Sequence, residues 1–321
     1  MDIEEIRAFL SIVELGGFTR AAGTLHRSQP AISRRISLLE QDLGAPLLER
    51  VRGRVSLTEA GRAFLPYAEA VVATLKDGRE AVRAMAKDAR GSLSLAMVGT
   101  LADTSIVALL RRFARGAKPV RLELRTASSR EVSALVRRGD VTLGLRYFMD
   151  PSPELTARQV GVEQLLVICA ADHHLAGRRL RDPQPLAAER WVGFPPARSQ
   201  PESFGNVLQR RLAGAGLEAA DVTLIDSLTA QKRLVEAGFG LALIPASSVR
   251  EELRLGSVRT VDVPALRTEV PISLIHRRTG YLSAAARSLL ATIVGAAPRL
   301  TPRRRRTSVA RVAARGRQSR A

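Results

Sequence analysis

The segment from Phe18 to Gly61 constrains the fold of this chain more than any other part of its sequence. Its pattern predicts a helix, a tight turn, a second helix, a basic loop and the start of a long helix. Apolar residues recur at helical spacing and are expected to face inward: Ala21, Ala22 and Leu25, then Ile32, Ile36, Leu39 and Leu43. The opposite face of the second helix carries Gln29, Ser33, Arg34 and Ser37. Amide, hydroxyl and guanidinium groups on an exposed helix face are suited to reading a DNA major groove.

The residues at the ends of these helices support this interpretation. Thr19 is expected to cap the first helix, because its hydroxyl can accept from an unpaired backbone N–H. Ser28 is expected to cap the second, with Pro30 in the first turn, and Gly44 to end it. Beyond it, Leu47–Leu48 and 55–57 can pair as short strands around a loop that carries Arg50, Arg52 and Arg54. The sequence therefore predicts a wing with cations at its tip.

The run LHRSQPAISRRISLLEQDLGAPLLER, with VSLTEAG after it, resembles the N-terminal winged helix-turn-helix of the LysR-type transcriptional regulators. The resemblance implies that the second helix contacts DNA through Gln29, Pro30, Ser33 and Arg34, and we add Thr19 to this set. It also implies that Arg52 and Arg54 lie in or beside the minor groove. Two residues depart from the family pattern, since Leu48 stands where Phe is usual and Gly53 where a wing Arg is usual.

A single long helix is predicted from Thr58, its cap, to Lys87. One stripe of apolar residues, interrupted only by Arg79, follows it at alternating spacings of three and four: Leu65, Ala68, Val72, Leu75, Val82 and Ala86. The resemblance implies that this stripe pairs antiparallel with the same helix of a second subunit, and the alternative is packing on its own chain. A two-fold dimer reads an interrupted palindrome.

From about Gly91 to Ala297, strand and helix patterns alternate, which favours an α/β fold with parallel sheets covered by helices. Strands are predicted at 92–98, 120–126, 141–146, 164–170, 221–225, 241–245, 258–263 and 270–276, and helices near 104–114, 130–138, 203–213, 228–237 and 282–294. The segment LVEAGFGLALIP resembles the two-lobed effector domain of the same family, which is like a periplasmic binding protein.

The fold class expected is thus an α/β protein with an N-terminal winged helix-turn-helix, a long linker helix and a two-lobed effector domain. The predicted boundaries are 1–58 for the DNA-binding domain, 59–90 for the linker, 91–298 for the effector domain and 299–321 for a disordered tail. Lobe I would comprise 91–163 and 269–298, and lobe II 164–268. The chain would cross between the lobes near 161–164 and near 266–270.

Ligands of open α/β sheets bind past the carboxyl ends of the strands, so we expect the effector there, between the lobes. Gly99 and Thr100 follow one strand, and a hydroxyl beside helix N–H groups favours an anionic ligand. The predicted contacts are Thr100, Ser128, Ser129, Phe194 and Ser227, and Arg146 and Phe148 follow a third strand. For each hydroxyl the alternative, which does not exclude binding, is a simple helix cap.

The net charge of +19 suggests a nucleic-acid partner, but it is uneven. The stretch from Arg299 to Ala321 holds nine arginines and no acid. This tail has too little apolar content to fold, and it is either a non-specific arm on phosphates or a dispensable extension.

Neither a bilayer-spanning apolar stretch nor a signal peptide is recognisable in the 321 residues, so a cytoplasmic protein is expected. The single Cys169 lies in an apolar run and is expected to be a buried structural thiol. The four histidines are scattered, and no catalytic or nucleotide-binding motif appears. We therefore expect no enzyme activity, no cofactor and no metal.

These patterns predict a sequence-specific DNA-binding transcriptional regulator controlled by a small, anionic effector. By resemblance, effector domains would pair the dimers into a tetramer, and ligand-driven closure of the lobes would alter DNA bending and contact with RNA polymerase. Two alternatives remain open. One is a constitutive architectural DNA-binding protein that has no effector. The other is a solute-binding protein or enzyme whose N-terminal segment is only structural.

Overall fold

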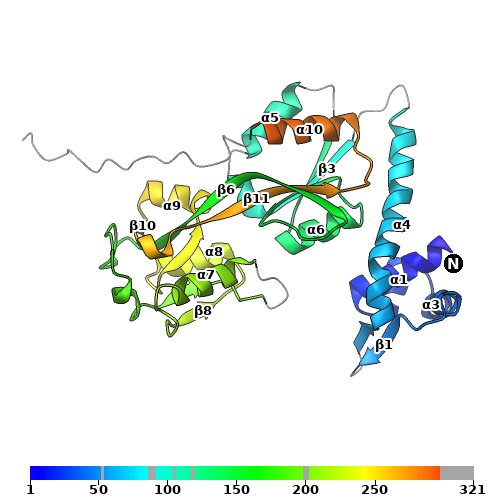
Figure 1. Ribbon diagram of the computed structural model, residues 1–321, viewed down its shortest axis with the longest axis horizontal. Helices are drawn as coiled ribbons and strands as arrows, with labels where there is room; N and C mark the ends of the chain where they lie inside the picture. The colour runs from blue at the N-terminus through cyan, green and yellow to red at the C-terminus, as the bar shows by residue number, and fades with distance from the viewer. Residues whose placement is uncertain (52–53, 86–91, 104–105, 117–119, 198–201, 297–321) are drawn as a thin grey trace, which may run out of the picture.

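The computed structural model of the chain describes residues 1–51, 54–85, 92–103, 106–116, 120–197 and 202–296. A small helical domain, a long helix and a two-lobed α/β domain follow one another along the chain (Figure 1). This arrangement confirms the predicted fold class. Arg52, Gly53 and the arginine-rich tail lie outside the described residues.

The N-terminal domain packs α1 (Ile3–Leu15), α2 (Phe18–Thr24) and α3 (Gln29–Leu43) around a core of aliphatic side chains and Phe9. Two short strands, β1 (Leu48–Val51) and β2 (Arg54–Leu57), pair antiparallel with Leu48 opposite Leu57. They form the predicted wing. Leu48 packs partly buried against the core, so Leu is accommodated at this position.

The long helix α4 (Glu59–Arg83) begins at Thr58, whose hydroxyl accepts from the N–H of Gly61, as predicted. Gly61 lies so close to the preceding wing strand that an added Cβ would meet the Leu47 carbonyl oxygen at 2.0 Å. The helix ends at Arg83, before the expected end at Lys87, and Ala86 and Lys87 lie outside the described residues.

Lobe I is built on three parallel strands, with β3 (Ser92–Met97) between β4 (Arg121–Thr126) and β5 (Leu143–Tyr147). Helices α5 (Ile106–Gly116) and α10 (Ala284–Gly295) cover one face of these strands, and α6 (Ser129–Arg137) covers the other (Figure 1). Because neighbouring parallel strands end at the same edge, the residues after β3, β4 and β5 come together there.

Two long strands, β6 (Leu155–Ala170) and β11 (Thr268–Arg277), run through both lobes as an antiparallel pair (Figure 1). The chain was expected to cross between the lobes near 161–164 and 266–270; β6 runs through the first range and β11 begins within the second. The two strands pair along the ladder with a register shift between Ile272 and Ser273. Hydrogen bonding along a strand keeps the two lobes in one sheet.

Within the described residues the sheet is seven-stranded and mixed, in the order β10-β6-β11-β5-β3-β4, with β9 also on β6. The expected parallel pairing therefore holds for β3 with β4 and β5, whereas β6 pairs antiparallel with β9, β10 and β11. The strands of lobe II are β7 (Trp191–Gly193), β8 (Val222–Leu224), β9 (Ala242–Pro245) and β10 (Val258–Val261). Its helices are α7 (Phe204–Ala213), α8 (Leu228–Glu236) and the unpredicted α9 (Arg250–Leu255). Among the described residues, no helix is long and apolar enough to cross a bilayer.

Candidate functional site

The second helix of the N-terminal domain has the two faces that its sequence predicts. Ile32, Ile36 and Leu39 are buried in α3, while Gln29, Pro30 and Arg34 are exposed and Ser33 is half-buried. Ser28 caps the helix by accepting from the N–H of Ala31, and Gly44 ends it in the left-handed conformation. Leu43 departs from the prediction, since it is 38% exposed rather than buried. It lies in the last turn of α3, beyond the part of the helix that the core covers.

The two adjacent arginines of α3 have different environments. A guanidinium nitrogen (Nη1) of Arg35 lies 3.1 Å from the Glu4 carboxylate, which ties α3 to α1. No hydrogen bond or ion pair joins Arg34 to any other residue that the structure describes. Arg34 therefore keeps its donors for an external acceptor.

The prediction that Thr19 caps α2 was wrong. Gly16 ends α1 in the left-handed conformation, and Gly17 is the residue before α2, which begins at Phe18. Thr19 therefore lies inside the first turn, where its exposed hydroxyl is on the surface of the domain. The Arg20 guanidinium donates to the Gly16 carbonyl and completes this tight connection.

The wing carries its cations on the strands next to its tip. Arg50 lies in β1 opposite Val55, and Arg54 lies in β2 opposite Val51. These positions differ from the prediction of loop residues, because the strands pair up to 51 and 54. Arg52, predicted at the tip, lies outside the described residues.

The helix α4 has three faces with different surroundings: one packs on the DNA-binding core, one on lobe I, and one is exposed. Ala68 is buried in the DNA-binding core, with Leu65 and Val72 packed against it. Ala73 is fully buried beside Gly139 of lobe I. A third face is exposed among the described residues, and it holds Tyr67 at 71%, Val71 at 44%, Leu75 at 38% and Val82 at 71%. The first part of the predicted stripe (Leu65, Ala68 and Val72) is thus covered by its own chain, whereas Leu75 and Val82 of the same stripe are exposed.

The structure brings Thr100 to the carboxyl ends of the lobe I strands. It lies in a short 3-10 turn, Gly99–Asp103, and its hydroxyl donates to the Tyr147 hydroxyl at 3.0 Å. Thr100 therefore links the end of β3 to the end of β5. It does not cap α5, which begins only at Ile106.

Of the other predicted hydroxyls, Ser128 and Ser227 are helix caps. Ser128 and Glu131 form a reciprocal capping box at the start of α6, and Ser227 accepts from the N–H of Ala230 at the start of α8. Ser129 is the first residue of α6, and its carbonyl accepts from the Ser133 hydroxyl. The N-terminus of α6 thus lies near the polar cluster described below.

Aromatic rings join the two lobes at the same edge. Phe204 of α7 lies 4.9 Å from Tyr147 and 5.7 Å from Phe148, measured between ring centroids, and 6.0 Å from the predicted contact Phe194. Sequence reasoning missed Tyr147 and Phe204, because both look like ordinary core residues. Their contact across the lobes arises only because β5 of lobe I and α7 of lobe II meet in the folded chain.

Phe148 has a strained backbone, with a φ of 63° that bulky side chains rarely adopt. Two hydrogen bonds to β11 hold it: its N–H donates to the Pro271 carbonyl, and its carbonyl accepts from the Ser273 hydroxyl. Strain that the surroundings enforce in this way is concentrated at ligand-binding sites. This geometry turns the chain sharply at the end of β5.

A buried arginine lies at this strand end. Arg146 donates to Asp150, to the Ser133 hydroxyl at 3.0 Å and to the Tyr147 carbonyl at 3.1 Å. Burial lowers the pKa of Arg146, opposed by the charges of Asp150 and of Glu202 from lobe II. Burial alone would raise the pKa of Asp150, but hydrogen bonds from Ser133 and Ser152 and the Arg146 charge bring it below its usual value. A cation within the apolar run LGLRYF was the sequence signal for such a buried pair.

The adjacent histidines have a partner that their spacing does not reveal. His173 and His174 stack with their ring centroids 4.6 Å apart, and the Nε2 of each lies 3.2 Å from one oxygen of Glu189. These three side chains have the types and spacing of metal ligands. However, Nδ1 of His173 accepts from the N–H of Leu175, so the proton of the neutral ring lies on Nε2, facing Glu189. The contacts thus describe a carboxylate hydrogen-bonded to two imidazoles.

Comparison with known proteins identifies the families of both domains. A sequence model of the LysR substrate binding domain matches residues 86–298, and one of the lysR-family bacterial regulatory helix-turn-helix protein matches residues 3–62. The HTH-type transcriptional regulator TfdS of Cupriavidus pinatubonensis is 32% identical over 279 residues, covering 86% of this chain and 92% of that protein. The RuBisCO operon transcriptional regulator of Allochromatium vinosum is 27% identical over 300 residues, covering 94% of this chain and 98% of that one.

Solved structures extend the likeness to the whole chain. The crystal structure of CbnR, a LysR family transcriptional regulator, has a TM-score of 0.62 at 26% identity, covering 92% of this chain and 99% of that chain. Full-length CbnR in complex with its target DNA has a TM-score of 0.59 at 28% identity, with 93% and 99% covered. The chain belongs to the LysR family, DNA-binding transcriptional regulators whose effector-binding domain places them under the control of a small molecule.

Proposed function

We propose that α3 reads base edges with Gln29, Ser33 and Arg34. The observation that carries this proposal is the exposed polar face of α3, on which Arg34 has no partner within the described residues while Arg35 is bound to Glu4. Thr19, whose hydroxyl can donate to a phosphate, and Pro30, which can only pack against the DNA, are both exposed and would lie at the DNA. Arg52 and Arg54 of the wing would hold phosphate or the minor groove.

The subunits would pair through the exposed face of α4, which shares Leu75 and Val82 with the stripe that the sequence suggested and adds Tyr67 and Val71. These residues recur at helical spacing, and such an apolar face is stable only when covered. A two-fold dimer would place two α3 helices on an interrupted palindrome, and effector domains would join dimers into a tetramer. Such an assembly acts on the chromosome, so we place it in the cytoplasm, in contact with RNA polymerase.

The effector would bind at the lobe edge, among Thr100, Ser128, Ser129, Phe194 and Ser227. We add Phe148 and Phe204 to this set, because their rings join the two lobes there. Arg146 is already neutralised by Asp150, so an anionic group of the effector would meet the N-terminus of α6 and the Thr100 hydroxyl instead. Closure of the lobes on this ligand would change the angle between the DNA-binding dimers and so the DNA bend.

The first experiment selects bound sequences from random double-stranded DNA, at a stated salt concentration, with the full chain and with its Arg34→Ala variant. Enrichment of an interrupted palindrome by the parent protein alone would support specific readout by a two-fold dimer. Equal selection by both proteins would contradict the role of Arg34. No enrichment by a folded protein would favour the solute-binding or enzymatic alternative.

The selected operator then allows a screen for the effector. Small aromatic and aliphatic carboxylates are tested for a rise in Tm, which a specific ligand must cause. A binding ligand should lose its effect in the Thr100→Val and Phe204→Ala variants and should change the DNA bend angle. A protein that binds its operator but responds to no metabolite would be a constitutive architectural binder.

A further inference from the structure

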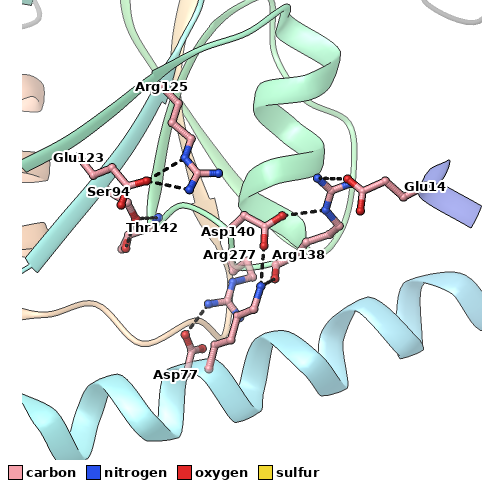
Figure 2. A network of polar contacts seen from close by, with 10 residues as sticks. Glu14, Asp77, Ser94, Glu123, Arg125, Arg138, Asp140, Thr142 and Arg277 are labelled. Atoms are coloured by element: carbon pink, nitrogen blue, oxygen red, sulfur yellow. Dashed lines mark hydrogen bonds and ion pairs between the residues drawn. The ribbon is translucent and has the colours of Figure 1, made fainter. Parts of the chain in front are cut away.

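The helix α4 is joined to lobe I of its own chain by ion pairs. Lys76 Nζ lies 2.5 Å from Asp140 Oδ1 and also donates to the Arg138 carbonyl. Asp77 accepts from Arg277 at 2.5 Å with one oxygen and from the N–H of Tyr281 at 3.0 Å with the other. Figure 2 shows Asp77 on α4 facing Arg277, which ends the long strand β11. Lobe I therefore holds α4 at two adjacent residues.

The same contacts reach the DNA-binding domain. Arg138 follows α6, and its Nε donates to Asp140 at 2.9 Å while its Nη2 lies 3.2 Å from Glu14 of α1 (Figure 2). Burial alone would raise the pKa of Asp140, but the bonds and charges of Lys76 and Arg138 bring it below its usual value. Arg138 thus lies where the DNA-binding domain, the linker helix and lobe I meet.

A chain of polar contacts joins this junction to the proposed effector edge. Arg137 Nε lies 3.7 Å from Glu69 of α4, and Arg137 Nη1 donates to the Ser152 hydroxyl at 3.3 Å. The N–H of Ser152 donates to Asp150 at 2.9 Å, and Asp150 binds the buried Arg146 at the end of β5. Arg137 at the end of α6 and Arg138 after it therefore contact the linker helix, and Arg137 also contacts the loop that holds the buried Arg146–Asp150 ion pair.

The interface between α4 and lobe I is small and mostly polar, as in interfaces that can separate. Its apolar part is small, with Ala73 packed on Gly139, whose left-handed φ of 65° brings the backbone close to the helix. The rest is ion pairs whose side chains keep some contact with solvent, so that each charged group can exchange its partner for water when the two parts separate. Small and polar interfaces between domains of one chain permit relative motion. A modest change at one end can therefore shift the balance between docked and released forms.

We propose that these contacts form a latch with two states, in which lobe I is either docked on the linker helix of its own subunit or released from it. Arg137 is the positioning residue that transmits the arrangement of Asp150 and Ser152 to Glu69. The inference rests on the proposed effector edge for its physiological trigger, but the latch itself is defined by Asp77–Arg277 and Lys76–Asp140. The alternative is a static buttress, an interface with the same ion pairs that stays docked whatever happens at the proposed effector edge.

The latch is tested by exchanging the charges of one pair. Single cysteines replace the exposed Arg79 on α4 and Arg112 on α5 and carry spin labels, while Cys169 is fully buried and does not compete. Labelled protein is diluted with unlabelled protein so that only distances within one subunit are measured. Asp77→Arg and Arg277→Asp should each add a population at longer distance, and the double exchange should restore the parent distribution. Single variants with the parent distribution, or a double variant no nearer to the parent than either single one, would overturn the latch.

The coupling of Asp150 and Ser152 to the linker helix through Arg137 is tested on the same labelled protein without any effector. Asp150→Asn and Ser152→Ala should both raise the released population, and Glu69→Gln should make the Ser152→Ala effect smaller because both changes act through Arg137. Asp262→Asn is the control, since Asp262 pairs with Arg267 in lobe II by a similar ion pair. Circular dichroism identifies variants that fail to fold, and the milder Ser152→Ala then decides. An unchanged distribution in folded Ser152→Ala would show a buttress. Failure of the effector screen alone would leave these distances unaffected, so the two proposals fail separately.

Discussion

At the scale of single residues, two adjacent arginines differ in whether their guanidinium groups are already bound to another residue that the structure describes. Arg34 and Arg35 are adjacent on α3, yet among the described residues only Arg35 has an ion-pair partner, Glu4. Helical periodicity predicted that Arg34 faces outward. It could not predict the Arg35 contact, because Glu4 lies on a different helix whose packing angle is set by the core.

Arg34→Ala should weaken binding to the selected operator by about 1–3 kcal/mol and relax the preference at one base pair. Arg35→Ala removes a cation of the same size next to it, but its partner is protein. We expect it to cost at most about 1 kcal/mol of stability and to leave base preference unchanged. Binding curves against single-base operator variants, at fixed salt, distinguish the two. Equal loss of affinity at all positions by Arg34→Ala would indicate a phosphate contact.

Cys169 was expected to be a buried structural thiol, and it is fully buried in β6. Burial, with the charges of Glu189 and Asp172, raises the pKa of its thiol to about 11. Since the thiolate is the reactive form, a thiol reagent at pH 8 should modify the folded protein far more slowly than the unfolded chain. Rapid modification of the native protein, followed by mass spectrometry, would contradict this prediction.

At the scale of elements, α4 shows what periodicity predicts and what it leaves open. The spacing of its apolar residues predicted a long amphipathic helix correctly, as did the Thr58 cap. Periodicity could not predict which residues cover each face of α4, because those residues belong to domains far apart in the sequence. The same limit applies to β6, of which the local pattern predicted only 164–170, and to the ladder that pairs β6 with β11 across the lobes.

Two glycines of α4 give opposite predictions for the same substitution. Gly61→Ala places a Cβ 2.0 Å from the Leu47 carbonyl oxygen, so the wing and helix must separate, and we expect a loss of roughly 1–3 kcal/mol in the free energy of unfolding. Gly78 is exposed with nothing within 4 Å, and Gly78→Ala should add about 0.5–1 kcal/mol through helix propensity. Denaturant unfolding measures the free energy of unfolding of both variants. Similar changes in the two variants would contradict the prediction.

At the scale of the whole molecule, the exposed face of α4 is the strongest reason to expect self-association. Val82→Glu puts a charge on this face at a residue that is 71% exposed, and Leu255→Glu does the same on lobe II at 67%. Only Val82→Glu should weaken the dimer, because a buried unpaired charge is costly. Sedimentation velocity over a concentration series compares the two. Dissociation by Leu255→Glu instead would place the interface elsewhere.

The junction of the three parts should also leave a mark on the pH dependence of stability. The pKa of Asp140 is below its ordinary value of 3.8, so its folded-state contacts stabilise the protein above that value and are lost as pH falls through the lowered pKa. The stability difference between the parent and Asp140→Asn should therefore be constant near neutral pH and shrink below about pH 4. Unfolding curves at successive pH values test this. A difference that stays constant to pH 3 would show that the Asp140 ion pairs contribute nothing.

The sequence by itself determined the winged helix-turn-helix, the long helix and the α/β character of the rest. Caps, turns and apolar periodicity are local properties, and each acts within a few residues. The same local rules predicted Thr100, Ser128 and Ser129 as strand-end or helix-start residues. Only the tertiary structure decided which strand ends meet, which arginines of α3 and α6 are already bound, and which face of α4 lacks cover. These outcomes depend on contacts between residues as much as 204 positions apart, such as Asp77 and Tyr281. Packing and charge pairing over such separations leave no periodic trace in the sequence.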